Sequence, residues 1–149
     1  MSSDGGLRPL FRQHLRDQAH WQSIEVGLIA AGVPDSNVCL MPGREVWVEM
    51  KQTSSWAVGV RTEQIGWHKH RIRMGGRTFV ATRRRHDGGP RKGPAVDELW
   101  LCSGNYLGMI SSGGLQHPDI NWSGVWSGGP TQWNWDRVRQ ILENEPCSV

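Results

Sequence analysis

Residues 46–51, with the sequence Val-Trp-Val-Glu-Met-Lys, bring an acid and an amine to one side of a predicted strand. Because side chains alternate between the two faces of a strand, Glu49 and Lys51 share one face and the two valines share the other. A second acid, Asp35, follows Pro34 a short distance upstream. Two carboxylates beside an amine can bind a divalent metal and hold an activated water. This is the chemistry of phosphodiester hydrolysis, so the pattern predicts a nuclease.

A β-hairpin is expected to bring Asp35 to the other two residues. One strand begins at Asp35 and ends near residue 41, the sequence Pro42-Gly43 turns the chain, and residues 45–51 return antiparallel. Whether the turn holds two residues or four, Asp35 lies close to the end of the hairpin that carries Glu49 and Lys51.

The flanking segments complete an α/β domain. Apolar spacing predicts a helix over 9–20 and a strand over 21–27, although a continuation of the helix to Gly32 is also compatible with the sequence. A second helix is expected over 63–74, with Thr62 as its N-cap and Gly75-Gly76 at its end.

The remaining elements follow the second helix. Residues 77–82 are predicted to form a strand that leads into three arginines, and the Gly/Pro-rich stretch 86–95 is expected to be a loop. Beyond this loop we predict a pair of strands within 98–109, turning near Ser103-Gly104-Asn105, and a short helix over 134–144.

Length and composition indicate one ordinary domain. The chain has 149 residues, of which 37% are hydrophobic and 21% charged. We expect a single nuclease domain over 1–149, with its core at about 8–85, the basic loop at 86–95 and a Trp-rich extension at 97–149. The sequence shows no apolar run of membrane-spanning length and no signal peptide. Its three cysteines form no metal-binding pattern, as expected for reduced thiols in the cytoplasm.

Positive charge is concentrated in the middle of the chain. Residues 61–92 contain ten basic and two acidic residues, a net charge of +8, while the other seven basic and twelve acidic residues give −5. Such a cluster is compatible with a solvated surface and with a polyanion-binding surface. In the second case the candidate nucleic-acid-binding residues are Lys69, Arg71, Arg73, Arg83, Arg84, Arg85, Arg91 and Lys92.

Tryptophan and histidine give weaker signals. Four tryptophans fall within 121–135 and could stack on bases, but packing against the sheet is favoured in a chain with few Phe and Tyr. His68, His70 and His86 lack the shared spacing of metal ligands, so we expect them at the surface or near phosphates.

Three of these features together resemble the PD-(D/E)XK nuclease superfamily: the stretch Gly32-Val33-Pro34-Asp35, the triplet Glu49-Met50-Lys51, and Gln64 in the following helix. Within it, the sequence is similar to small stand-alone VRR-NUC nucleases and Holliday junction resolvase-like proteins of phages, over residues 8–85. The resemblance implies a restriction-endonuclease-like core of helix, three-stranded sheet, helix and strand. It also implies Asp35 and Glu49 as Mg²⁺ ligands with the Met50 backbone carbonyl, and Lys51 as the residue that orients or deprotonates the attacking water.

The resemblance is incomplete at the third acidic position. Gln64 corresponds to a helix glutamine that recurs in several of these families. The usual glutamate of the first helix has no counterpart, because His14 and Asp17 occupy that stretch. Glu25, on the predicted first strand, is the candidate for this role and for the remaining metal ligand.

These expectations describe a Mg²⁺-dependent DNA endonuclease, with Mn²⁺ as a substitute, that acts on branched or junction DNA. The resemblance implies a phage protein at work in the host cytoplasm, without membrane association, in replication or repair. Because a junction is resolved by two symmetric cuts, a homodimer is also expected. The alternatives are a sequence-specific or nicking endonuclease of the same fold, and a catalytically inactive nucleic-acid-binding protein.

Overall fold

A computed structural model describes residues 4–24 and 31–147, which form a mixed α/β structure around one six-stranded sheet. The first part of the chain runs through a helix, three strands, a helix and a strand, which is the order that the sequence predicts. The elements are α1 Leu7–Leu15, β1 Ala19–Ser23, β2 Ser36–Leu40, β3 Arg44–Thr53, α2 Thr62–Arg73, β4 Thr78–His86, β5 Val96–Ser103, η2 Gly104–Tyr106, α3 Leu107–Gly113, η3 Gly114–Gln116, β6 Gly124–Trp126 and α4 Trp135–Asn144.

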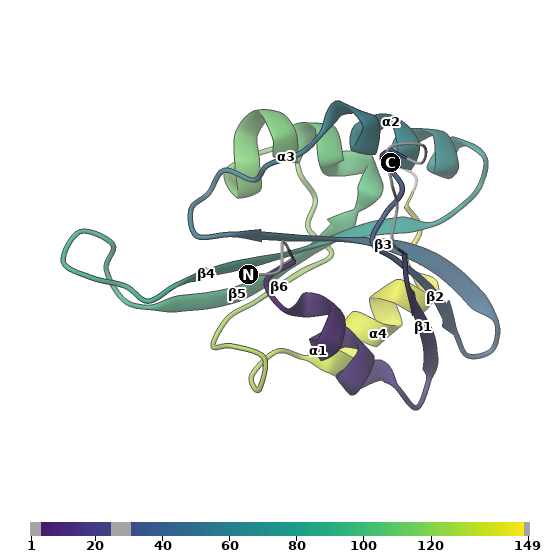
Figure 1. The fold of residues 1–149 in the computed structure, drawn as a ribbon, viewed down its shortest axis with the longest axis horizontal. Coiled ribbons are helices and arrows are strands. Elements are labelled where there is room, and N and C mark those ends of the chain that lie inside the picture. The colour runs from purple at the N-terminus through teal and green to yellow at the C-terminus, as the bar shows by residue number, and fades with distance from the viewer. Residues whose placement is uncertain (1–3, 25–30, 148–149) are drawn as a thin grey trace.

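The strands lie in the sheet in their order along the chain, from β1 to β6. Strands β3 and β4 are parallel and are joined by α2, while all other neighbours are antiparallel. Helices α2 and α3 cover one face of the sheet, and α1 and α4 cover the other (Figure 1). The crossover through α2 is what brings a helix over the central strand β3.

The larger hydrophobic core lies between the sheet and the helices α1 and α4. On α1, Leu7, Phe11 and Leu15 recur every four residues and are all buried, which explains why this segment is helical. On β3, Val46 and Val48 point into the same core. The predicted alternation along this strand is therefore confirmed, and the opposite face of β3 is turned toward α2.

A smaller hydrophobic core lies between the sheet and the helices α2 and α3. One of its helices, α3, was not predicted from the sequence. Of the expected strand pair within 98–109, the first strand is confirmed as β5, but the second is wrong, because the chain leaves β5 through a 3-10 turn and enters α3. The Ser103 hydroxyl accepts a hydrogen bond from the Asn105 N–H at 3.1 Å and so begins this turn. Leu107 and Ile110, three positions apart, then bury their side chains against the sheet, which a strand could not do with that spacing.

The other predicted elements are present with shifted bounds. Helix α1 ends at Leu15 rather than near residue 20, and β1 rules out a continuation of this helix to Gly32. The hairpin of β2 and β3, the helix α2 and the short helix α4 lie where they were expected, although Arg61 rather than Thr62 is the N-cap of α2. Strand β4 continues to His86, beyond its predicted end. The first strand is β1, shifted toward the N-terminus, and residues 25–30 lie outside the described part of the chain.

The packing interpretation of the Trp-rich segment is confirmed. Trp133 is buried in the larger core, and the Trp135 ring meets Phe11 of α1 at 5.1 Å between centroids. On the other face, Trp122 lies 5.0 Å from Trp100 of β5. Among the described residues, no helix is both long and apolar enough to cross a membrane.

Candidate active site

Asp35 is fixed against the central strand by a hydrogen bond to its backbone. Asp35 immediately precedes Ser36, the first residue of β2. The pair of Ser36 with Val48 is the last backbone pair at this end of the β2–β3 hairpin. Asp35 Oδ2 accepts a hydrogen bond from the Met50 N–H at 2.8 Å. The side chain thus continues the β2–β3 ladder by one position, and the predicted closeness of Asp35 to the Glu49–Lys51 end of the hairpin is confirmed.

Gln64 joins Glu49 and Lys51 into one network. Its Nε2 donates to Glu49 Oε1 at 2.7 Å, and its Oε1 accepts from Lys51 Nζ at 2.8 Å and from the Arg61 N–H at 3.1 Å. Because an amide donates only through nitrogen and accepts only through oxygen, these partners determine its orientation. Lys51 Nζ also lies 3.6 Å from Glu49 Oε1. One glutamine at the start of α2 therefore holds the acid and the amine of β3 in place.

Two contacts keep α2 close to this network. Gly32 has a positive φ of 89°, and a side chain there would collide with the carbonyl of Glu63, so the loop before Asp35 packs directly on the first turn of α2. One turn after Gln64, His68 Nδ1 shares a 2.7 Å hydrogen bond with the Thr78 hydroxyl of β4.

The expected position of His68 at the surface is wrong. The side chain is completely buried, and burial together with the nearby charge of Lys51 lowers its pKa to about 4. The imidazole is therefore neutral near pH 7 and holds α2 against β4. His70, in contrast, is exposed as predicted.

Partial desolvation of Asp35 and burial of Glu49 make the ionisation of both carboxylates unfavourable. Glu49 is only 3% exposed, and desolvation, with repulsion from Asp35, raises its pKa to about 7 against the opposing effect of Lys51. Desolvation also raises the pKa of Asp35, although the Met50 N–H, Arg8 and Lys51 act in the other direction. A divalent cation between the two acids would remove this penalty.

The donor set fits a hard cation such as Mg²⁺. Glu49 Oε2 is buried and has no hydrogen-bond partner among the described residues, so an acceptor is left for a ligand. Those residues include no cluster of three or more acidic, histidine or cysteine side chains that could hold a metal. Two carboxylates and a backbone carbonyl are sufficient for Mg²⁺, which keeps several of its waters and is commonly held by one or two carboxylates.

Comparison of the sequence with protein-family models and with curated proteins finds no match.

An additional charged pair, which the sequence did not single out, lies beside Asp35. Asp4 is 2% exposed, and its Oδ2 lies 2.6 Å from Nε of Arg8, one turn further along the chain. Arg8 lowers the pKa of Asp35 and Asp4 raises it, so both charges are felt at the site. The acid–base spacing of four residues at the start of a helix was the available signal.

The residues that occupy the place of the usual first-helix glutamate lie away from the site. His14 stacks on Trp135, with 4.2 Å between ring centroids, and the side chain of Asp17 is 84% exposed and follows the far end of α1. Glu25 lies outside the described residues. Besides Glu49, Asp4 is a described acid whose charge acts on Asp35.

The predicted nucleic-acid-binding residues divide into paired and exposed groups. Arg83 donates to both oxygens of Asp97, at 2.8 and 2.7 Å, and Arg84 pairs with Glu98 at 2.7 Å. Both arginines are more than nine-tenths buried, so these side chains stabilise the β4–β5 pair and we no longer expect phosphate contacts from them. The exposed members are Lys69, Arg71, Arg73, Arg85, Arg91 and Lys92.

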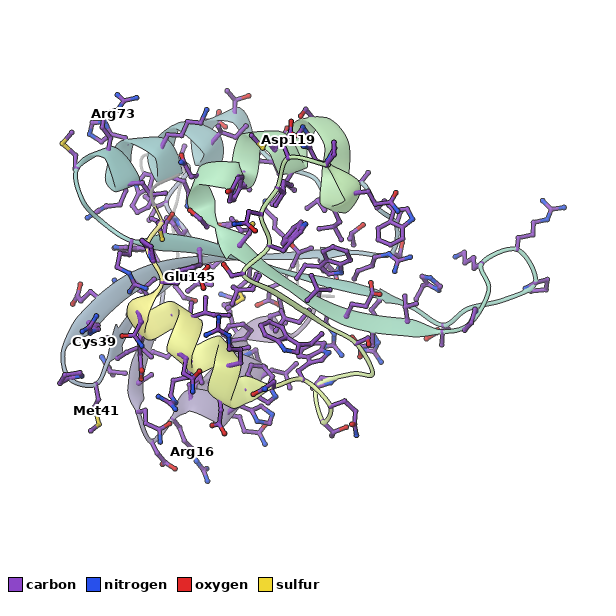
Figure 2. All side chains as sticks on the ribbon, turned by 180° about the vertical axis from the view of Figure 1, so that it is seen from behind. Arg16, Cys39, Met41, Arg73, Asp119 and Glu145 are labelled. Atoms are coloured by element: carbon purple, nitrogen blue, oxygen red, sulfur yellow. The ribbon has the colours of Figure 1, made fainter. Side chains whose placement is uncertain are left out.

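The exposed group is itself spread over two places. Arg73 lies at the end of α2 remote from the β4–β5 hairpin (Figure 2), whereas Arg85, Arg91 and Lys92 lie on that hairpin. Arg71 packs its guanidinium over the ring of Trp67, at 4.8 Å from the centroid.

Proposed function

We propose that this protein is a metal-dependent DNA endonuclease that hydrolyses phosphodiester bonds in branched or junction DNA. The observation that supports the proposal most strongly is the pair of half-buried Asp35 and buried Glu49, with a Glu49 oxygen that has no partner among the described residues and with Lys51 held beside it by Gln64. Buried acids of raised pKa next to an oriented amine are typical of functional sites. The order of helix, three strands, helix and strand supports a restriction-endonuclease-like core.

Each residue has a defined task in this proposal. Asp35, Glu49 and the Met50 carbonyl would hold Mg²⁺, or Mn²⁺ in its place. The bound ion would supply a water of lowered pKa and neutralise charge on the phosphate. Lys51, whose side chain is 14% exposed, holds its ammonium 3.6 Å from Glu49 Oε1. Its donors can orient the attacking water and stabilise a phosphate oxygen as negative charge develops there.

Gln64 has a positioning task. By accepting from Lys51 and donating to Glu49 Oε1, it separates the amine from the acid, and Glu49 Oε2 is left without a partner in the described part of the chain. Without it, Lys51 could close fully onto Glu49 and compete with a cation for the carboxylate.

The proposed substrate follows from the exposed basic residues. Arginine and lysine at the surface can contact the phosphate backbone, but backbone contacts do not distinguish one base sequence from another. Recognition of DNA shape is therefore the proposed source of selectivity. Two symmetric cuts in a junction would require a dimer with two-fold symmetry.

Incubation with different DNA structures tests the proposal. A four-way junction, a linear duplex and single-stranded DNA of the same sequence are each incubated with the protein in Mg²⁺, Mn²⁺ or EDTA. The expected result is cleavage of the junction in either metal and none in EDTA. Glu49→Gln should be inactive, whereas Glu45→Gln, at an exposed position of the same strand, should cleave as the parent does.

The outcomes separate the alternatives. Cuts at one sequence in the linear duplex would favour a restriction-type or nicking enzyme of the same fold. Binding without any cleavage in either metal would contradict the proposal and favour a nucleic-acid-binding protein. Cleavage by Glu49→Gln at the parent's rate would show that the activity does not belong to this site.

A further inference from the structure

The β4–β5 hairpin extends well beyond the body of the protein. The two strands remain paired out to His86 and Val96, past the last position at which β4 is paired with β3, Arg84. The hairpin projects from the sheet with no helix over it (Figure 1). We call residues 85–97 the arm.

The end of the arm is an ordered turn. Gly89 and Gly93 form a β-bridge, with hydrogen bonds of 3.0 Å in both directions, and the Lys92 N–H donates to the Gly89 carbonyl at 3.1 Å. Gly88 has a φ of 80°, and a side chain there would collide with the Gly93 carbonyl. This turn therefore presents Arg91 and Lys92 in a defined place, at low cost in conformational entropy on binding.

Asp97, at the base of the arm, is bound by Arg83 and by the Trp133 ring N–H, but none of the arm's residues belongs to either hydrophobic core of the described chain. The core residues nearest the arm are Ala81 on β4 and Leu99 on β5. Its tip, residues 88–94, carries Arg91 and Lys92 and no acidic residue. Both side chains are exposed, and neither forms an ion pair with a described carboxylate.

We propose that the arm is a DNA-binding ribbon that enters the groove of a duplex next to the cleaved bond and places Arg91 and Lys92 against its phosphates. A two-stranded ribbon is about as wide as the major groove, which is roughly 12 Å across. The basic tip complements the phosphates that line the groove. The inference rests on the proposed function for its choice of partner, and it adds a binding surface outside the site.

The register of the sheet gives the reach of the arm. Lys51 is paired with Thr82, and Pro90 at the tip lies eight residues further along the chain. At a rise of about 3.3 Å per residue this is roughly 25 Å. Since base pairs repeat every ~3.4 Å along a duplex, the tip would contact phosphates up to about seven base pairs from the cleaved bond.

Two variants of the full chain test the arm, and a third is the matched control. Arg91→Ala/Lys92→Ala removes the charges, and a second variant replaces residues 88–94 with Asn-Gly, which closes a tight hairpin. The control, Arg16→Ala/Arg44→Ala, removes two exposed arginines from elsewhere on the molecule. Arg16 lies at the end of the molecule opposite the arm (Figure 2). Affinity for a fluorescent duplex is measured in EDTA between about 50 and 200 mM salt.

The arm proposal predicts that both arm variants bind the duplex at least tenfold more weakly than the parent at about 100 mM salt. The salt slope should fall by about 1.8, at 0.9 for each lost phosphate contact. The control should lose much less affinity. Footprints on a nicked or cleaved duplex should shorten on one side by up to about seven base pairs in the arm variants.

Failure of the arm proposal is distinguishable from failure of the proposed function. If the parent cleaves in Mg²⁺ but the arm variants match its affinity, slope and footprint, the arm proposal is overturned and the nuclease remains. If the parent binds without cleaving and the arm variants lose that binding, the arm is supported and the nuclease is not. Equal losses of DNA affinity in the arm variants and in the control would show that only the net charge of the protein matters, and would overturn the arm proposal.

Discussion

Glu49→Gln should stabilise the metal-free protein at neutral and alkaline pH while it abolishes cleavage. Burial and the neighbouring Asp35 raise the pKa of Glu49 from 4.5 to about 7, so the folded protein binds this proton more tightly than the unfolded chain does. Stability is therefore lost as the pH rises from 4.5 through about 7. At ~1.4 kcal/mol per pKa unit, the ionised Glu49 lowers the free energy of unfolding by roughly 3 kcal/mol above that range.

Glutamine removes this effect because it carries no charge at any pH. Near pH 8 in EDTA, the variant should melt roughly 6 to 12 °C above the parent, at 2 to 4 °C per kcal/mol for a chain of this size. The difference should shrink toward zero as the pH approaches 4.5. Saturating Mg²⁺ should close the gap at pH 8, because a ligand at 100 times its Kd stabilises the parent alone by about 2.7 kcal/mol.

Thermal melts over this pH range, with and without Mg²⁺, are the measurement. Glu45→Gln is the control, since Glu45 is exposed on the same strand and its replacement should change stability by no more than about 0.5 kcal/mol. A Glu49→Gln protein less stable than the parent near pH 8 in EDTA would refute the reasoning, because it would mean that the carboxylate is satisfied without a metal.

Three further substitutions probe the site. Lys51→Met should reduce cleavage at least ~100-fold while leaving DNA affinity within a few-fold of the parent, in rate and binding measurements on one preparation; retained cleavage would remove Lys51 from the mechanism. Gln64→Leu should cost roughly 10- to 100-fold in Mg²⁺ affinity or activity, seen in a metal titration of cleavage, and an unchanged titration would contradict its positioning role. Arg8→Gln should raise the pKa of Asp35 further, so the acidic limb of the pH–rate profile should move to higher pH; a limb that stays in place would show that Arg8 does not act on the site.

The part of the site that the sequence predicts is the part built by local structure. The hairpin from Asp35 to Lys51 is one short-range unit, and its period-two alternation determines which side chains share a face. The helix that carries Gln64 could be predicted from its flanking residues, but Gln64 itself is singled out only through the resemblance, and its partners are not predicted. In α2 the buried side chains are Gln64 and His68, both polar, so an apolar stripe could not show which face is turned toward the sheet.

The missed features depend on contacts between distant segments. Asp4 and Arg8 reach Asp35 only because the N-terminus is fastened to β4, where Arg83 donates to the Gly5 carbonyl at 2.7 Å. The ion pairs of Arg83 and Arg84 depend on the β4–β5 register, which places Arg84 directly opposite Glu98. α3 was mistaken for a strand because its two buried apolar residues span less than one turn, too short a stretch for its period to be read.

Single-turnover cleavage after Mg²⁺ is added to a preformed complex tests the central claim most directly. The complex contains a labelled four-way junction and either the parent, Asp35→Asn or Glu45→Gln, each shown beforehand to bind the junction in EDTA. The account predicts that the parent and Glu45→Gln cleave at the same rate, and that Asp35→Asn loses at least ~100-fold with its complex intact. Cleavage by Asp35→Asn at the parent's rate, or cleavage by the parent in EDTA, would contradict a metal-dependent site at Asp35 and Glu49.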